Sequence, residues 1–153
     1  MLFLQVNPLA AALDAEWVFP TAECFHIVGF GIAIGTIALV DLSLLGAGLR
    51  RKAAARLLKA TEAWTLLALA VVVLAGMVLF LTDPREYFLN VPFRFKIVCL
   101  LLAIIFNYTI HRRVVLSERA PAAVSGLVGA VSLMLWSAVV VGGLFIAFFP
   151  KGF

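Results

Sequence analysis

The sequence predicts an all-α membrane protein, a single domain over residues 1–153 that folds as an up-down-up-down bundle of four transmembrane helices with a short N-terminal interfacial helix. The composition is the first indication, because 65% of the residues are hydrophobic and only 13% are charged, against about 45–50% and about 25% in soluble domains. The second is four apolar stretches long enough to cross about 30 Å of hydrocarbon. The third is their short connections, which make consecutive helices antiparallel neighbours.

The N-terminal segment 1–17 is too interrupted by acidic residues to be a signal peptide. We expect a short helix at the membrane surface there, with Trp17 and Phe19 at headgroup depth. The apolar stretches predict spans at about 25–49, 63–82, 93–110 and 122–149. Pro84 and Pro92 break the chain between the second and third spans, and Pro121 precedes the fourth.

Lysine and arginine are concentrated in the first and third loops, which are expected to face the cytoplasm by the positive-inside rule. These loops hold Arg50, Arg51, Lys52, Arg56, Lys59, Arg112, Arg113 and Arg119. Both termini would then lie on the outer side of a bacterial inner membrane. The net charge of +4 follows from this bias and not from a nucleic-acid surface. The expected partners are the lipid bilayer and either another membrane protein or a second copy of the chain.

Small residues predict the faces along which the helices pack. In the first span we expect the ridge Gly31-x-x-x-Gly35, extended by Ala38, to face another helix. In the fourth span an inward face is predicted at helical spacing, consisting of Ser125, Gly129, Ser132 and Trp136 and ending near Gly142 and Gly143.

A polar stripe on the third span is expected to face the bundle interior, because lipid offers polar groups no partners. The stripe consists of Lys96, Cys99, Ala103, Asn107 and His111. Asp41 in the first span lies at the depth of the stripe's inner end, and its candidate partners are Asn107, His111 and Arg50. An intramembrane cluster of Asp41, Asn107 and His111 is therefore predicted. It is either a proton or ion site or a structural hydrogen bond between the first and third helices.

A second group of polar and sulfur-containing residues lies near the outer surface. It consists of Glu23, Cys24, His26, Met77, Lys96 and Cys99. His26 and Met77 are candidate haem ligands, and Cys24, His26, Met77 and Cys99 are together a candidate copper(I) site. The alternatives are an interfacial hydrogen bond for His26 and apolar packing for the others. If Cys24 and Cys99 approach each other, the outer side would favour a disulfide.

The sequence excludes one type of haem site and contains no catalytic motif. A bis-histidine haem on His26 and His111 is excluded because these residues lie near opposite membrane faces. The sequence contains no nucleophile–base set, phosphate loop or His-rich metal motif. We therefore expect no catalytic residue. Our first expectation is also that no cofactor is bound, and the alternatives are haem b and copper.

Several short motifs give the chain a family resemblance, which covers roughly residues 17–113. The motifs are His26-x-x-Gly29, Gly35-Thr36, Asp41-Leu42-x-Leu44-Leu45-Gly46, Trp64-Thr65, Gly76-x-x-Leu79-Phe80, Asn90-x-Pro92-Phe93-Arg94-x-Lys96, Asn107 and His111-Arg112. With them the chain resembles an uncharacterised family of bacterial four-helix membrane proteins, a domain of unknown function. In general layout it is similar to copper resistance protein D and to four-helix b-type cytochromes. This resemblance implies a four-helix fold and, more distantly, copper handling or electron transfer.

Three functions are consistent with these features. The first is a non-catalytic accessory or assembly subunit of a membrane complex, since four spans are present without a catalytic set. The second is a haem- or copper-binding redox module around His26. The third is a proton-linked transporter or channel subunit that uses Asp41, Asn107 and His111, which would require oligomerisation because four spans are few for a transporter.

Overall fold

The computed structural model describes residues 16–47, 53–117 and 120–148. In these ranges four helices are long and apolar enough to cross a membrane. The helical elements are, in order, α2 (Val18–Leu45), α3 (Ala54–Thr82), α4 (Pro84–Leu89), α5 (Val91–Phe106), η2 (Asn107–His111), α6 (Arg112–Leu116) and α7 (Ala122–Ile146). The predicted all-α bundle of a multi-pass membrane protein is confirmed. The interfacial helix was predicted on a segment that lies, except for Glu16 and Trp17, outside the described residues.

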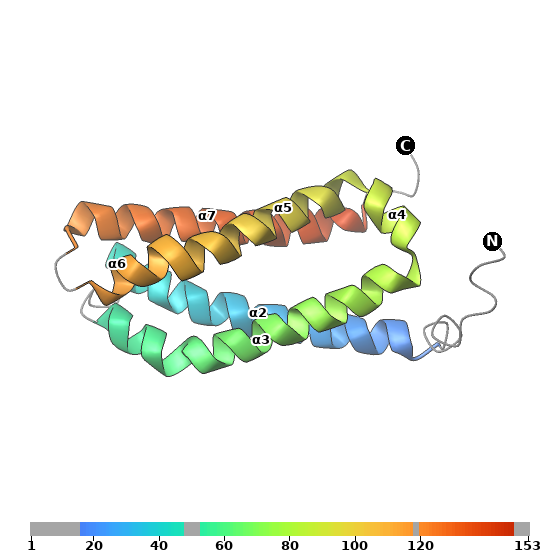
Figure 1. Ribbon diagram of the computed structural model, residues 1–153, viewed down its shortest axis with the longest axis horizontal. Coiled ribbons are helices and arrows are strands. Elements are labelled where there is room, and N and C mark those ends of the chain that lie inside the picture. The colour runs from blue at the N-terminus through green and yellow to red at the C-terminus, as the bar shows by residue number, and fades with distance from the viewer. Residues whose placement is uncertain (1–15, 48–52, 118–119, 149–153) are drawn as a thin grey trace.

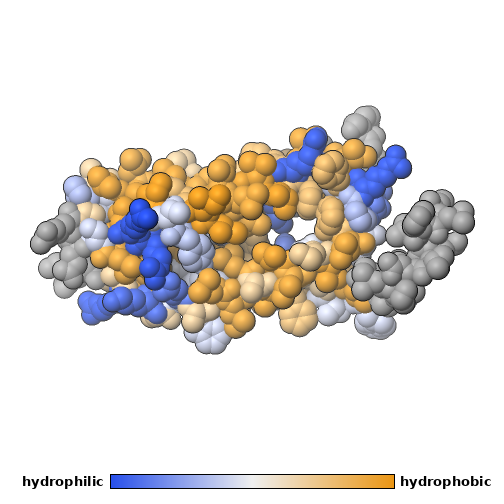
Figure 2. Space-filling model, in the orientation of Figure 1, coloured by the Kyte–Doolittle hydropathy of each residue, from blue (hydrophilic) through white to orange (hydrophobic). Residues whose placement is uncertain are grey.

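The four spans form two layers, α2 beside α3 and α5 beside α7, which join along α2 and α7 (Figure 1). One end of the bundle, which we call the terminal end, holds the start of α2 and the end of α7. The opposite end, which we call the basic end, holds Arg56, Lys59, Arg112 and Arg113. Hydrophobic side chains cover the middle of the molecule between these ends (Figure 2), as expected of a surface that lies in lipid.

The helices extend beyond the predicted spans at three of their ends. Helix α2 begins at Val18 rather than near residue 25, α3 begins at Ala54 rather than at 63, and the third span continues to Leu116 rather than 110. Hydropathy marks only the part of a helix inside the hydrocarbon, whereas a helix can continue into the headgroup region, where polar side chains are solvated. At their C-terminal ends α2 and α7 stop at Leu45 and Ile146, four and three residues before the predicted 49 and 149.

Local signals in the sequence fix several helix ends. Helix α2 ends at Leu45 and is followed by the cap residue Gly46, whose φ of 74° lies in the left-handed region that glycine tolerates best. The Asp83 side chain caps α4 by accepting a hydrogen bond from the backbone N–H of Glu86, and Asn90 caps α5 by accepting from that of Phe93. The connection between α3 and α5 therefore consists of the short helix α4, with one side-chain cap at the start of α4 and another at the start of α5.

The close contact between α2 and α3 is made by Gly29 and not by the predicted ridge of Gly31 and Gly35. A Cβ atom on Gly29 would lie 3.1 Å from Val72 Cγ2 and 3.2 Å from the carbonyl oxygen of Ala68. Gly31 and Gly35 are exposed, and a Cβ on either would meet nothing within 4 Å among the described residues. The predicted ridge is wrong because it was placed on the opposite side of α2, two residues or roughly 200° from Gly29.

We expect Gly31→Leu to leave the free energy of unfolding within about 0.5 kcal/mol of wild type. Gly29→Leu should lower it by about 1–3 kcal/mol or more, because the new side chain must displace Val72 or the α3 backbone. Unfolding of both variants in mixed detergent micelles, followed by tryptophan fluorescence, measures the difference. Equal destabilisation by the two substitutions would contradict this packing.

The predicted inward face of the fourth span is confirmed. Ser125, Gly129, Ser132, Trp136 and Gly142 are buried, and Gly143 is partly buried. Gly129 brings α7 against α2, since a Cβ there would lie 2.9 Å from the carbonyl oxygen of Asp41. This contact positions the polar site described next.

Candidate functional site

Asp41 and His111 form a buried pair at the basic end of the bundle. The carboxylate oxygen Oδ1 of Asp41 lies 2.6 Å from Nε2 of His111, and their side chains are 0% and 1% exposed. Because a carboxylate only accepts hydrogen bonds, the Nε2–H of His111 is the donor when Asp41 is ionised. Of the three predicted partners of Asp41, the structure thus selects His111, while Arg50 lies outside the described residues.

A π-helical turn over Asn107–His111 positions the histidine. Such a turn inserts one residue into an α-helix and changes the direction of the side chains that follow, and it is common at functional sites. Asn107 and His111 are both buried. The polar stripe of the third span therefore faces the interior, as its spacing predicted, with Cys99 and Ala103 also buried.

Several polar side-chain atoms, two of them in this pair, are buried without a hydrogen-bond partner in the described part of the chain. They are Asp41 Oδ2, His111 Nδ1, Asn107 Oδ1, Ser132 Oγ and Trp136 Nε1. A buried polar group without a partner costs about 1–3 kcal/mol, so a cluster serving only to join helices would be expected to satisfy its groups. Asp41 Oδ2 and His111 Nδ1 are thus the two atoms of the pair at which a further hydrogen-bonding group can be bound.

A small cavity of about 20 Å³ adjoins the pair and is lined by both Asn107 and His111. This volume is enough for one water molecule. From α2 and α3 the cavity is lined by threonines and Glu62 together with the apolar Ile37, Val40 and Leu58, and the hydroxyl oxygens of Thr36 and Thr65 are 2.8 Å apart. The cavity therefore gives the histidine a mixed polar and apolar neighbourhood, and the pair itself is shielded from the surface.

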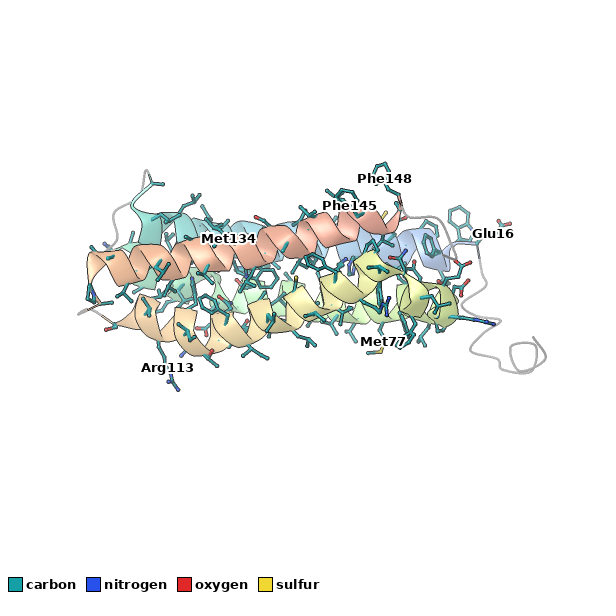
Figure 3. The ribbon with its side chains drawn as sticks, turned by 90° about the horizontal axis from the view of Figure 1, so that it is seen from above. Glu16, Met77, Arg113, Met134, Phe145 and Phe148 are labelled. Carbon is teal, nitrogen blue, oxygen red and sulfur yellow. The ribbon has the colours of Figure 1, made fainter. Side chains whose placement is uncertain are left out.

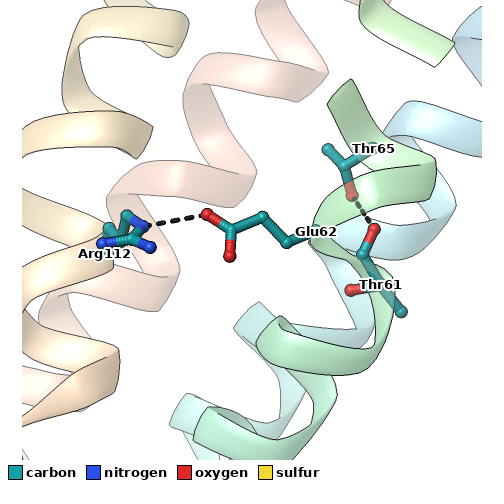
Figure 4. A network of polar contacts seen from close by, with 4 residues as sticks. All are labelled: Thr61, Glu62, Thr65 and Arg112. Atoms are coloured by element: carbon teal, nitrogen blue, oxygen red, sulfur yellow. Dashed lines mark hydrogen bonds and ion pairs between the residues drawn. The ribbon is translucent and has the colours of Figure 1, made fainter. Parts of the chain in front are cut away.

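An ion pair lies where this cavity meets the molecular surface. Arg112 Nε is 3.0 Å from Glu62 Oε1, and the two side chains are 43% and 31% exposed (Figure 4). Both residues line the cavity, and their bond joins α6 to α3. Next to Glu62, the hydroxyl of Thr65 donates to the carbonyl oxygen of Thr61 (Figure 4). The cavity thus lies between this partly exposed ion pair and His111.

At the terminal end, His26 is held between α3 and α5. Its Nδ1 lies 2.9 Å from the carbonyl oxygen of Val72, to which the Nδ1–H must donate because a carbonyl only accepts. Its Nε2 lies 3.4 Å from the ammonium nitrogen of Lys96. Both ring nitrogens are therefore engaged, and a role for His26 as a metal or haem ligand would require one of these contacts to break.

The other predicted ligands of the outer group are not gathered around His26. Met77 is 55% exposed and points away from the bundle (Figure 3). Cys24 is exposed, Cys99 is buried in the apolar core beside Ala33 and Trp136, and both thiols are free. No group of three His, Cys, Asp or Glu side chains that could hold a metal ion occurs in the described ranges. Haem or copper binding stays a prediction, which oxidised and reduced absorption spectra with metal analysis would test.

Residue depth alone does not predict two of the pairings found in the structure. Arg112 enters the sequence analysis as an orientation signal and in the motif His111-Arg112, and Glu62 lies just outside the predicted second span. The signal that could have found Glu62 is its place in a polar stripe with Thr61 and Thr65, one helical turn apart in α3. Within the predicted outer group, the structure places the ammonium of Lys96 against His26.

Comparison with known proteins adds no family. No protein-family model matches the chain, and no curated protein or solved structure is significantly similar to it. The resemblance to uncharacterised four-helix membrane proteins, to copper resistance protein D and to b-type cytochromes therefore stays a prediction.

Proposed function

We propose that this small polytopic membrane protein binds and releases a proton at the Asp41–His111 pair and works as a proton-linked transporter or channel subunit. The observation that carries the proposal is a fully buried carboxylate–imidazole pair whose histidine also lines a small cavity next to the surface ion pair of Glu62 and Arg112. Intramembrane carboxylates and histidines are costly and commonly belong to proton or ion pathways.

The charge of the pair explains why it would exchange a proton. Asp41 ionised beside a neutral His111 leaves one net negative charge out of water, which is expensive. One added proton, on the unpartnered Nδ1 of His111, makes an imidazolium that balances the carboxylate. The pair therefore has a neutral form that holds the proton and a charged form that has given it up.

The position of the cavity supports proton exchange with the basic end of the bundle. Because His111 lines it together with Glu62 and Arg112, a proton can reach the imidazole from the basic end through one water molecule. Toward the terminal end, the buried core is apolar and includes Ile37, Leu69 and Trp136. We propose that the bundle opens toward the basic end in this conformation and that transport requires a second one.

We further propose that the basic end faces the cytoplasm of a bacterial inner membrane and that both termini lie outside. The support is the placement of Arg56, Lys59, Arg112 and Arg113 at one end, as the positive-inside rule requires of cytoplasmic loops. Four spans leave little room for a complete pathway, so the working unit is proposed to contain a second copy or another membrane protein.

Proton flux into liposomes tests the function. Purified protein in vesicles that contain a pH-sensitive dye should acidify the lumen when a membrane potential is applied, and Asp41→Asn should lose this protein-dependent flux. Thr109→Val is the matched control, because Thr109 is an exposed residue of the same π-helical turn as His111. Equal flux in wild type and Asp41→Asn, or no flux above that of empty vesicles in wild type, would refute the proposal.

A non-catalytic accessory or assembly subunit is the second candidate. The observation that favours it is the exposed pair Gly31 and Gly35 on α2, beside which the described chain leaves open space. Such a ridge lets a helix of another protein approach closely. If a partner uses it, Gly31→Leu should abolish a complex seen on native gels while leaving the bundle folded. A wild-type protein that migrates as a monomer and co-purifies with nothing would exclude this role.

A further inference from the structure

Lys96 points into the bundle although it lies close to a helix end. It belongs to the second turn of α5, which begins at Val91. A lysine at this depth ordinarily extends its stem so that the ammonium reaches the polar interface. Here the ammonium nitrogen lies 5.3 Å from the centre of the Phe30 ring and 3.4 Å from His26 Nε2.

All four spans contribute to the surroundings of Lys96. Glycines on α7 make room for it, since a Cβ on Gly142 would lie 3.1 Å from the Cβ of Lys96 and a Cβ on Gly143 would lie 3.1 Å from its Nζ. On α3, Gly76 makes room for the ring of His26 in the same way, at 3.0 Å from Cε1. Larger residues at these positions would displace the pair, so the backbone is shaped around it.

The positive charge of Lys96 has no acidic partner in the described part of the chain, where no carboxylate lies within 4 Å of its nitrogen. An ammonium has three N–H donors. One faces His26 Nε2, which can accept because the Nδ1–H of His26 donates to Val72. At least one further donor, and the charge itself, remain for another group.

The pair is reachable from the side of the bundle. Helices α3 and α5 belong to different layers and are not packed along their length. The space-filling view shows an opening between these layers toward the terminal end, with hydrophilic atoms at its edge (Figure 2). A group entering here would come from the headgroup region or from water beside it.

We infer that Lys96, held in place by the hydrogen bond of its ammonium to His26, is the cationic group of a binding site for a phosphate oxyanion at the terminal end of the bundle. Lysine binds phosphate as a point charge through charge-assisted hydrogen bonds, and basic pockets between membrane helices bind anionic headgroups. The oxyanion is that of a lipid headgroup or of free inorganic phosphate. This site is distinct from Asp41–His111 and does not depend on proton transport.

Thermal unfolding of the purified protein in mild detergent tests the inference with two probes. The first is sodium phosphate against sodium chloride at equal ionic strength, and the second is phosphatidylglycerol against diacylglycerol, which lacks the phosphate. At least one phosphate probe should raise the midpoint of wild type in a saturable manner. Lys96→Met should weaken the apparent affinity by about tenfold or more, because it removes a charge-assisted hydrogen bond.

The matched control is Arg94→Met, which removes an exposed positive charge from the same helix and should leave the response unchanged. Lys96→Arg keeps the charge and should retain part of the response to the phosphate probes. Lys96→Gln replaces Lys96→Met if Lys96→Met does not fold. A response to both probes supports a site open to free phosphate, and a response to the lipid alone supports a headgroup site. No response of wild type to either probe, or an equal response in the Lys96 variants, would overturn the inference.

Discussion

Replacing His111 by alanine is expected to lower the free energy of unfolding by about 3–5 kcal/mol, the range found when one partner of a buried ion pair is removed. The reason is that Asp41, which is fully buried, would keep its carboxylate without the hydrogen-bond donor 2.6 Å away. The substitution also empties the space of a fully buried side chain. Unfolding in mixed micelles, monitored by tryptophan fluorescence, measures the loss.

A double-mutant cycle separates the charge from the cavity. Asp41→Asn in the His111→Ala background removes the uncompensated carboxylate and should restore part of the stability, with a coupling energy of about 0.5–3 kcal/mol. Asp41→Asn alone should cost less than His111→Ala, because a neutral histidine can remain buried. Strictly additive effects would mean that the two side chains do not interact in the membrane.

The second large effect is expected at Gly129, where α7 crosses α2. Gly129→Ala should lower the free energy of unfolding by about 1–3 kcal/mol, because its Cβ would lie 2.9 Å from the carbonyl oxygen of Asp41 and 3.1 Å from the Cβ of Leu44. The backbone of α2 cannot yield without moving Asp41. Gly129→Ala is therefore also expected to reduce proton flux, in the liposome assay described for Asp41→Asn.

Gly126 provides the control one turn earlier on the same helix. A Cβ there meets nothing within 4 Å among the described residues, so Gly126→Ala should leave stability unchanged or raise it by up to about 1 kcal/mol through helix propensity. Comparable losses for the two substitutions would show that α7 does not cross α2 at Gly129.

The positions of the spans and the inward faces of two of them could be predicted from the sequence. Apolar stretches of membrane length have few alternatives to a helix, since every backbone polar group must be satisfied within the segment. Polar and small residues at helical spacing then mark the side that avoids lipid. This reasoning succeeded for the stripe from Lys96 to His111 and for the face from Ser125 to Trp136.

The same reasoning failed on α2, which carries glycines on more than one side. Gly29, Gly31 and Gly35 are chemically identical, and their order along the chain does not say which of them meets a neighbouring helix. Rotation about the helix axis decides it, and that rotation is set by the packing of all four helices. The structure turns Gly29 toward α3 and leaves the other two exposed.

The sequence by itself determined a four-span helical bundle and the depth of each polar residue, because hydrophobic length and the helical rise per residue are local properties. Only the tertiary structure decided the partners, pairing Asp41 with His111 and Lys96 with His26. Each pair joins α2 to the third span across the bundle, at residues separated by 70 positions in the chain. Such contacts depend on how whole helices are rotated and, for His111, on one π-helical turn, neither of which a single segment specifies.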